Sequence, residues 1–381
     1  MKVLKFGGTS VGSAQRMKEV AKLITDGEQK IVVLSAMSGT TNTLVEISDY
    51  LYKKNPEGAN EIINRLEAKY KQHVNELYST DEYKQKTQEF IKAQFDYIRS
   101  YTKDIFTLFE EKVILAQGEL ISTNMVTNYL QEQGVNAILL PALEFMRTDK
   151  NSEPDPVYIK EKLAAQLEIH PDAEIYITQG FICRNAYGEI DNLQRGGSDY
   201  TASLIGAAVN ASEIQIWTDI DGMHDNDPRI VDKTSPVRHL HFEEAAELAY
   251  FGAKILHPTC VQPAKYANIP VRLLNTMEPT APGTLISNDT EKGKIKAVAA
   301  KDNITAIKIK SSRMLLAHGF LRKVFEIFES YQTSIDMICT SEVGVSVTID
   351  NTKHLNEILD DLKKYRSEEH TSELQSRITI S

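Results

Sequence analysis

Apolar and polar residues alternate along the first 50 residues in an order that predicts strand, helix, strand and helix. Val3 to Phe6 is a short apolar run that stops at two glycines, and residues 13–24 then carry apolar side chains at helical spacing. Residues 31–34 are apolar and mostly β-branched, which suits a parallel strand buried on both faces. This order predicts an α/β fold with a mainly parallel sheet.

The chain up to residue 295 extends this pattern and adds a helical insertion. Residues 57–112 are polar and carry two apolar stripes, one through Ile62, Leu66 and Tyr70 and one through residues 91–105, which predicts a hairpin of amphipathic helices. The other expected strands are 137–140, 174–178, 213–218 and 271–274, and the expected helices lie near 119–132, 157–167, 199–209 and 242–250. A turn-rich stretch at 278–283 closes the region, and we interpret residues 1–295 as one domain.

A second, smaller domain is expected over residues 296–365. Its expected elements are strand 304–310, helix 319–331, strands 335–339 and 343–349, and helix 354–365. The order β-α-β-β-α fits a ferredoxin-like module that lacks its last strand. Residues 366–381 are polar and aperiodic, and we interpret them as a non-native tail that carries no chemistry.

Composition narrows the class of protein. The 381 residues are 41% hydrophobic and 25% charged, and 43 Lys and Arg against 53 Asp and Glu give a net charge of −10. This acidity argues against binding to nucleic acid or to a membrane surface, because phosphate groups favour a basic face. We expect a cytoplasmic protein for two reasons. The apolar runs are shorter than a membrane span, and the N-terminus reaches a glycine turn where a secretory signal would still be apolar. The three cysteines, Cys183, Cys260 and Cys339, lie far apart in the sequence, so we expect neither disulfides nor structural zinc. We interpret them as small buried side chains.

The first glycine turn is a candidate anion site. Lys5 lies near the end of the first strand, and residues 7–10 (Gly-Gly-Thr-Ser) enter the next helix, so backbone N–H groups, two hydroxyls and an ammonium could meet a phosphate. The segment is neither a P-loop nor G-x-G-x-x-G, because Thr9 stands where a second glycine belongs. The alternative is an ordinary strand-to-helix turn with an exposed lysine.

Four further segments cluster charged residues at expected strand ends or helix starts: 118–120, 194–201, 217–229 and 251–258. Each also has a purely structural explanation. Glu119 and Asp199 would stabilise helix N-termini. Arg195 would form a surface ion pair, and Lys254 would extend its ammonium to water. Ligands of open α/β sheets bind at the carboxyl ends of strands, so the joint placement favours a functional cluster.

The segments 5–11, 34–42, 195–201 and 251–258 resemble those of aspartate kinases, and the first is highly specific within the amino-acid kinase superfamily. The resemblance covers about residues 1–365. It implies a three-layer amino-acid kinase fold followed by an ACT domain, a ligand-sensing module that is incomplete here. It also implies that ATP, with Mg²⁺, phosphorylates the side chain of L-aspartate, the first step toward lysine, threonine and methionine. The intact protein would be a homodimer.

This chemistry needs no general base. A side-chain carboxylate with a pKa near ~3.9 is ionised at pH 7, so the obstacle is repulsion between two anions. Positioned positive charge removes that obstacle. We therefore expect Lys5 and Lys254 to neutralise the phosphoryl oxygens, and the family motif implies that Asp199 positions both lysines.

The resemblance assigns the other residues to three groups. The substrate group is Ser35, Thr41, Glu119, Arg195 and Ser198; Arg195 would grip a carboxylate, and Glu119 the α-ammonium. The ATP group is Lys5, Gly7, Gly8, Ser10, Thr218, Asp219, His224, Asp227, Arg229 and Lys254, where His224 replaces a frequent tyrosine of the family. The effector group, for lysine or threonine, is Met314, Phe320, Leu321, Asp336, Thr340, Ser341 and Glu342, with core and turn positions as the alternative.

Other functions stay open at this stage. A kinase for acetylglutamate or glutamate belongs to the same class. A non-catalytic amino-acid sensor would need to have lost a key charged residue, yet all five are present: Lys5, Glu119, Arg195, Asp199 and Lys254. A fragment of a kinase fused to homoserine dehydrogenase is a third interpretation. Because the family usually carries two ACT units, we expect weakened feedback and dimerisation in this chain.

Overall fold

The computed structural model describes residues 1–103, 105–193, 196–227, 230–250, 256–289, 295–310, 318–341, 344–367 and 374–376, without the side chains of 258, 365–367 and 374–376. The chain divides into two compact units, Met1–Ala299 and Ala300–Ser381. None of the described helices is long and apolar enough to cross a membrane.

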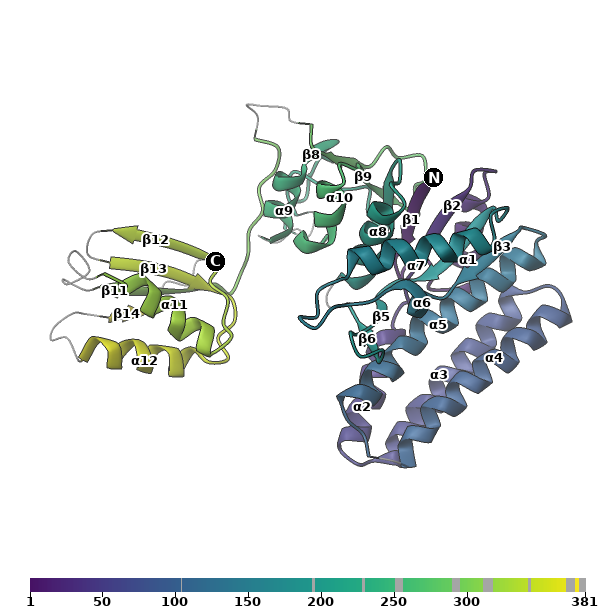
Figure 1. Cartoon of the computed structure of the whole chain (residues 1–381), viewed down its shortest axis with the longest axis horizontal. Coiled ribbons are helices and arrows are strands. Elements are labelled where there is room, and N and C mark those ends of the chain that lie inside the picture. The colour runs from purple at the N-terminus through teal and green to yellow at the C-terminus, as the bar shows by residue number, and fades with distance from the viewer. Residues whose placement is uncertain are drawn as a thin grey trace. The chain divides into compact units, whose positions relative to one another are not determined.

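The first unit alternates strands and helices (Figure 1). Its strands are β1 (Lys2–Phe6), β2 (Lys30–Leu34), β3 (Ala137–Leu140), β4 (Ile175–Gln179), β5 (Ile182–Arg184), β6 (Ile190–Asn192), β7 (Ile214–Thr218), β8 (His239–His241), β9 (Val271–Asn275) and β10 (Thr284–Ser287). Its helices are α1 (Ala14–Ile24), α2 (Thr40–Tyr52), α3 (Pro56–Leu77), α4 (Asp81–Ser100), α5 (Leu108–Glu132), α6 (Ala142–Phe145), α7 (Pro156–Ile169), α8 (Gly197–Ala208), α9 (Phe242–Tyr250) and α10 (Gln262–Tyr266), with short 3-10 turns η1 (Tyr101–Lys103) and η2 (Pro258–Val261).

Within the described residues, one eight-stranded sheet has the order β3-β4-β2-β1-β7-β9-β10-β8. Neighbouring strands are parallel except for the antiparallel pair of β9 and β10. The expected α/β sandwich with a mainly parallel sheet is therefore confirmed. The sequence pattern does not predict β8, β10 or the β5–β6 hairpin, whose strands are three or four residues long and, unlike the short strand β3, do not form an uninterrupted apolar run.

Side chains on β1 alternate between two hydrophobic layers. Leu4 and Phe6 belong to the core cluster that includes residues of α1 to α5, whereas Val3 belongs to the cluster that includes residues of α7 and α8. Alternate residues of a strand share a face, so Lys5 points to the same side as Val3. Strand geometry therefore directs the Lys5 side chain toward the layer that contains α8.

The helical insertion forms the expected hairpin of α3 and α4, with two corrections. Ile105 does not belong to the apolar stripe, because α4 ends at Ser100 and the Ile105 side chain is 86% exposed. Helix α5 begins at Leu108 rather than near residue 119, because Thr107 and Glu110 form a capping box. Glu119 therefore lies inside a helix and does not stabilise a helix start.

The second unit is a small antiparallel sheet with two helices. Its elements are β11 (Thr305–Lys310), α11 (Phe320–Ser330), β12 (Met337–Ser341), β13 (Gly344–Ile349), α12 (Leu355–Ser367) and β14 (Leu374–Ser376). The strand order β12-β13-β11-β14 is that of a ferredoxin-like module. Strand β14 is the fourth strand of this sheet and lies in the tail that we expected to carry no strand. It pairs with β11 through backbone groups, and such pairing needs no apolar pattern in the sequence.

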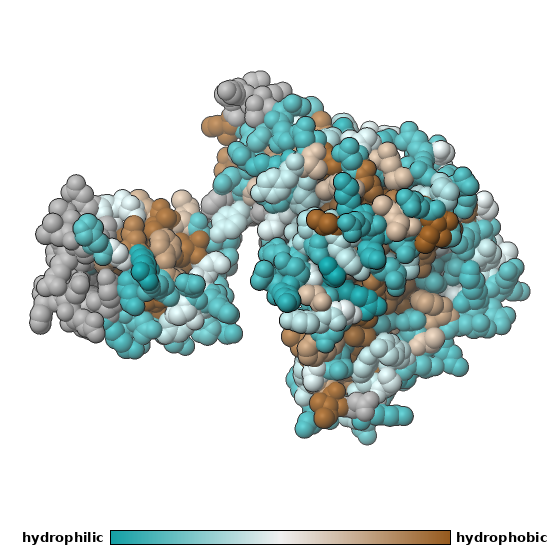
Figure 2. Space-filling view, viewed as in Figure 1, coloured by the Kyte–Doolittle hydropathy of each residue, from teal (hydrophilic) through white to brown (hydrophobic). Residues whose placement is uncertain are grey.

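Strand β12 lies at the edge of this sheet and is exposed along its whole length. Met337 and Ile338 are exposed there, and Figure 2 shows a hydrophobic patch over this strand. Cys339, also on β12, is exposed, contrary to the expectation of a buried thiol, whereas Cys183 and Cys260 are buried and free.

Candidate active site

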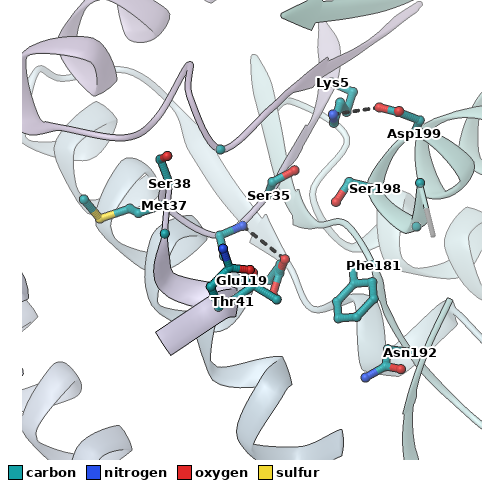
Figure 3. Close-up of a pocket in the computed structure, with 16 residues that line it drawn as sticks. Lys5, Ser35, Met37, Ser38, Thr41, Glu119, Phe181, Asn192, Ser198 and Asp199 are labelled. Carbon is teal, nitrogen blue, oxygen red and sulfur yellow. Dashed lines mark hydrogen bonds and ion pairs between the residues drawn. The ribbon is translucent and has the colours of Figure 1, made fainter. Parts of the chain in front are cut away.

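A cleft of about 610 Å³ opens at the carboxyl ends of β1, β2 and β4 (Figure 3). Its size is within the range of small-molecule sites. It brings together the loops that follow these strands, the starts of α2 and α8, the middle of α5 and the end of β6. Its lining residues are Lys5, Gly8, Ser35, Ala36, Met37, Ser38, Gly39, Thr41, Asn42, Glu119, Phe181, Asn192, Gly196, Gly197, Ser198 and Asp199.

At one end of the cleft, Lys5 and Asp199 form an ion pair. Lys5 Nζ lies 2.7 Å from Asp199 Oδ1, and the two side chains are only 12% and 13% exposed. Asp199 lies in the first turn of α8, so the helix presents its carboxylate to β1. Because the pair is mostly shielded from water, it fixes the direction of the Lys5 ammonium.

Two helices begin at this cleft without a side-chain cap. Gly39 before α2 and Gly196 before α8 have left-handed φ angles of 81° and 71°, and neither N-cap residue provides a side-chain hydrogen bond. The first-turn N–H groups of a helix carry partial positive charge, and uncapped ones are open to an anion. Gly8 lies so close to the loop after β2 that an added Cβ would meet the Ala36 carbonyl oxygen at 2.8 Å. The loops after β1 and β2 thus pack tightly here, and the two uncapped helix starts present N–H groups that suit a negatively charged ligand.

Glu119 lies on the opposite side of the cleft and is 3% exposed. Its Oε1 accepts a hydrogen bond from the Ala36 N–H at 3.1 Å, whereas Oε2 has no partner among the described residues. Burial raises the pKa of this carboxyl to about 8. Gly118 allows this placement, because a Cβ there would meet the Ala36 Cβ at 2.7 Å. A buried carboxyl with an unused oxygen is suited to bind a cation.

The structure brings most of the expected substrate residues together. Ser35, Thr41 and Ser198 line the same cleft as Glu119 and Lys5 (Figure 3). Five predicted residues lie outside the described part of the chain: Arg195, Arg229, Lys254, Met314 and Glu342. The predicted approach of Lys254 to Lys5 therefore stays a prediction.

Phe181 and Asn192 line the cleft but lie outside every segment that the sequence motifs indicate. Phe181 follows β4 and has a left-handed φ of 69°, which is uncommon for a bulky residue. Its N–H donates to Thr201 Oγ1 at 3.0 Å and its carbonyl accepts from the Leu193 N–H at 2.7 Å. Phe181 closely follows the apolar run of β4, whereas Asn192 lies in a mostly polar stretch and gave no signal.

Ser10 does not line the cleft, contrary to the expectation of an open hydroxyl and amide. It is fully buried, and its hydroxyl lies 2.7 Å from Thr276 Oγ1. Its N–H donates to the Gly7 carbonyl at 3.0 Å, and the Gly7 N–H donates to the Trp217 carbonyl at 3.2 Å. Of the predicted phosphate loop, Gly8 is therefore the residue that faces the cleft.

The expected nucleotide residues follow β7, the parallel neighbour of β1. The Thr218 hydroxyl donates to Asp219 Oδ1 at 3.1 Å. Both ring nitrogens of His224 are occupied, one 2.7 Å from Asp221 Oδ1 and the other 2.8 Å from Thr234 Oγ1. His224 therefore holds this loop together, and its nitrogens are not open to a nucleotide base. The Asp227 carbonyl accepts from the backbone N–H groups of residues 230 and 231 in the same loop.

The expected effector residues have different environments in the second unit. Phe320 packs in the hydrophobic core, whereas Leu321 is 38% exposed. Asp336 Oδ1 lies 3.6 Å from the Lys301 ammonium. Thr340 and Ser341 lie on the exposed strand β12. The core position of Phe320 agrees with the alternative interpretation of these residues as core and turn positions. The effector role of the others stays a prediction.

Comparison with known proteins identifies the family. The family model described as "Amino acid kinase family" matches residues 1–275. The chain is 38% identical to aspartokinase 1, chloroplastic, of Arabidopsis thaliana over 92% of this chain, but it spans only 63% of that protein's length. It is 36% identical to lysine-sensitive aspartokinase 3 of Escherichia coli (strain K12), with 92% of this chain and 78% of that protein covered. The structure of E. coli aspartokinase III in complex with aspartate and ADP (R-state) is similar, with a TM-score of 0.81 and 34% identity over 92% of this chain and 79% of that one. The chain therefore belongs to the amino acid kinase family and, within it, to the aspartokinases.

Proposed function

We propose that this chain transfers the γ-phosphoryl group of ATP to the side-chain carboxylate of L-aspartate and forms ADP and 4-phospho-L-aspartate. The similar E. coli structure is described as a complex with aspartate and ADP. All five charged residues expected for this reaction are present in the sequence. The product would be the first intermediate on the way to lysine, threonine and methionine.

The observation that carries this proposal is the unpartnered oxygen of Glu119. A buried carboxyl without a partner costs folding free energy, so packing alone does not account for it. A substrate ammonium beside Oε2 would favour the ionised form of Glu119 and offset that cost. Aspartate carries such an ammonium, whereas N-acetylglutamate does not.

The other end of the cleft supplies positive charge for phosphoryl transfer. Lys5 lies 2.7 Å from Asp199, which directs its ammonium without competing as a nucleophile. The uncapped helix starts at Gly39 and Gly196 add open N–H groups at the same cleft. These groups would stabilise the charge that two approaching anions share, while the substrate carboxylate, already ionised, attacks directly.

We propose that Mg²⁺ enters with the phosphates of ATP. Oxygen ligands of the substrate suit this cation, which keeps much of its hydration in proteins. In the part of the chain that the structure describes, no three His, Cys, Asp or Glu side chains are grouped to hold a metal ion. We propose that the chain's own residues position the substrate and the nucleotide.

The second unit is proposed to sense an amino acid. The E. coli relative is named lysine-sensitive. Asp336 offers a carboxylate to a cationic effector, although Lys301 lies 3.6 Å away and would compete for it. The exposed apolar edge of β12 supports the further proposal that two copies of the chain associate.

The test is ATP-dependent formation of an acyl phosphate trapped with hydroxylamine. L-aspartate, L-glutamate and N-acetyl-L-glutamate are compared at equal concentrations. We expect product from L-aspartate and very little from the acetylated substrate. More product from N-acetyl-L-glutamate or from L-glutamate would assign the chain to another acyl kinase, and nucleotide binding without turnover would indicate a sensor.

A further inference from the structure

We propose that Asn192 is a specificity-determining residue whose side-chain amide donates a hydrogen bond to the α-carboxylate of the amino-acid substrate. The proposal rests on the proposed function and extends it to a residue that the sequence did not indicate.

Asn192 lies at the end of β6 and lines the same cleft as Glu119 (Figure 3). Its Nδ2 is buried and has no hydrogen-bond acceptor among the residues that the structure describes. Buried polar groups are nearly always paired, so an unpaired donor in a ligand-sized cleft points to a partner supplied by the ligand.

Two side chains that line the cleft, from α5 and β6, carry complementary unpaired groups. Glu119 Oε2, an acceptor once the carboxyl is ionised, has no partner within the described residues, and neither has the donor Asn192 Nδ2. The α-carbon of an amino acid carries a donor, the ammonium, and an acceptor, the carboxylate. One zwitterion in the cleft would supply a partner to each of these groups, and its side chain would be free to extend toward Lys5.

The chain holds Asn192 in a fixed position relative to Glu119. Asn192 pairs with Ile182 in the β5–β6 hairpin, and its N–H donates to Asp191 Oδ1 at 2.7 Å. Asp191 Oδ1 also lies 2.8 Å from the Lys112 ammonium on α5, the helix that carries Glu119. This ion pair connects the hairpin that carries Asn192 to α5, the helix that carries Glu119.

A neutral amide selects its partner by hydrogen-bond direction. Its N–H groups can donate to a carboxylate oxygen or to the carbonyl oxygen of a primary amide, and the bond to the charged carboxylate is the stronger one. We therefore expect the cleft to prefer L-aspartate to L-aspartic acid α-amide, in which the α-carboxylate is an amide and the side chain is unchanged. The carboxylate that Asn192→Asp introduces would reverse the match, because it repels a carboxylate and accepts from an amide.

The experiment compares Asn192→Ala and Asn192→Asp with the wild-type chain. Dissociation constants of L-aspartate and its α-amide are measured by calorimetry, and turnover by hydroxylamine trapping. Asn185→Ala is the matched control, because Asn185 bonds to Glu189 within the turn of the same hairpin. Circular dichroism melting shows that each variant is folded.

For Asn192→Ala we expect L-aspartate to bind about tenfold to a hundredfold more weakly, with kcat nearly unchanged and with the preference over the α-amide lost. For Asn192→Asp we expect the preference to be reversed, and for Asn185→Ala both ligands to bind as in the wild type.

Two results would overturn the inference. Unchanged discrimination in folded Asn192→Ala would remove the residue from substrate recognition. Tighter binding of L-aspartate to Asn192→Asp would show that this side chain accepts from the ammonium instead. Failure of the proposed function gives a different result: the wild-type chain would bind L-aspartate without phosphorylating it, and the binding comparison would still decide the role of Asn192.

Discussion

The two ends of the cleft treat charge in opposite ways. At the Lys5 end, the cation is already paired with Asp199 at 2.7 Å, and both groups retain contact with water. At the Glu119 end, the carboxyl is 3% exposed and one of its oxygens has no partner in the described structure. In the described structure, Lys5 is thus paired before any ligand binds, whereas we propose that the ligand supplies the missing partner of Glu119.

This difference separates the two tasks of the site. A cation held in place by a protein carboxylate can stabilise charge during phosphoryl transfer without reorganising, which favours the rate. A carboxyl left unpaired binds a ligand ammonium more strongly than a solvated one would, which favours affinity and selectivity. Variants at the Lys5 end should therefore change kcat, and variants at the Glu119 end should change KM.

The largest expected effect is that of Lys5→Met. Removing the ammonium should lower kcat by about 10²–10³, comparable to the loss of one oxyanion-hole donor, or ~3–4 kcal/mol. Nucleotide and L-aspartate should still bind. Lys2→Met is the matched control, because Lys2 lies on the same strand but pairs with Glu28 at the surface. Steady-state kinetics of both variants decide the point, and near-normal turnover of Lys5→Met would remove this residue from the mechanism.

The second prediction concerns stability. The pKa of Glu119 is raised in the folded chain to about 8 from a value of 4.5. A carboxyl with a raised pKa stabilises the fold fully below pH 4.5, and this contribution is lost as the pH rises toward 8. Each unit of pKa difference is worth about 1.4 kcal/mol. From pH 5 to pH 8, the free energy of unfolding of Glu119→Gln should therefore gain roughly 3 kcal/mol relative to that of the wild type. Urea unfolding at several pH values measures this gain; parallel curves would contradict it.

The third prediction concerns affinity. Binding of an ammonium requires the Glu119 carboxylate, so below the pKa of about 8 the protein must first lose a proton. The dissociation constant of L-aspartate should fall about tenfold for each pH unit up to that value and then level off. Glu119→Gln should bind weakly and without this slope. Calorimetric titrations between pH 6 and 9 test both statements, and a slope that persists in the variant would assign it to another group.

The smallest expected effect is that of Gly196→Ala. An added Cβ would lie 2.5 Å from Cys260 Sγ, and the left-handed φ of 71° is unfavourable for alanine. The start of α8 should shift, and Asp199 with it, so we expect kcat to fall about tenfold at nearly constant KM. Gly188→Ala is the control, because Gly188 also has a positive φ but an added Cβ there has no neighbour within 4 Å. Equal kinetics of the two variants would show that the position of α8 is not critical.

Much of the fold was predictable, because long strands and helices carry clear periods. The strands near β1, β2, β4 and β7 were expected from apolar runs, and the order of the second unit from alternation. Glu119 was misplaced because Gly118 resembles a helix boundary. The true start was visible in the pattern Thr107 to Glu110, a capping box that the amphipathic stripe obscured.

The site was predictable where a motif carries its residues and not where tertiary packing places them. Lys5, Glu119 and Asp199 line the cleft together as the motifs suggest. Ser10 belongs to the same motif but is turned into the core by its contact with Thr276, which lies far away in the sequence. Asn192 reaches the cleft through a hairpin of three-residue strands, a feature that no periodicity could indicate.

The central claim is that Glu119 stays protonated until a substrate ammonium binds beside it. The most direct measurement is the number of protons released when L-aspartate binds at pH 7, obtained by calorimetry in buffers of different ionisation enthalpy. With a pKa of about 8 in the free protein, the wild-type chain should release close to one proton, and Glu119→Gln should release none. Binding of L-aspartate to the wild-type chain without proton release would contradict the account.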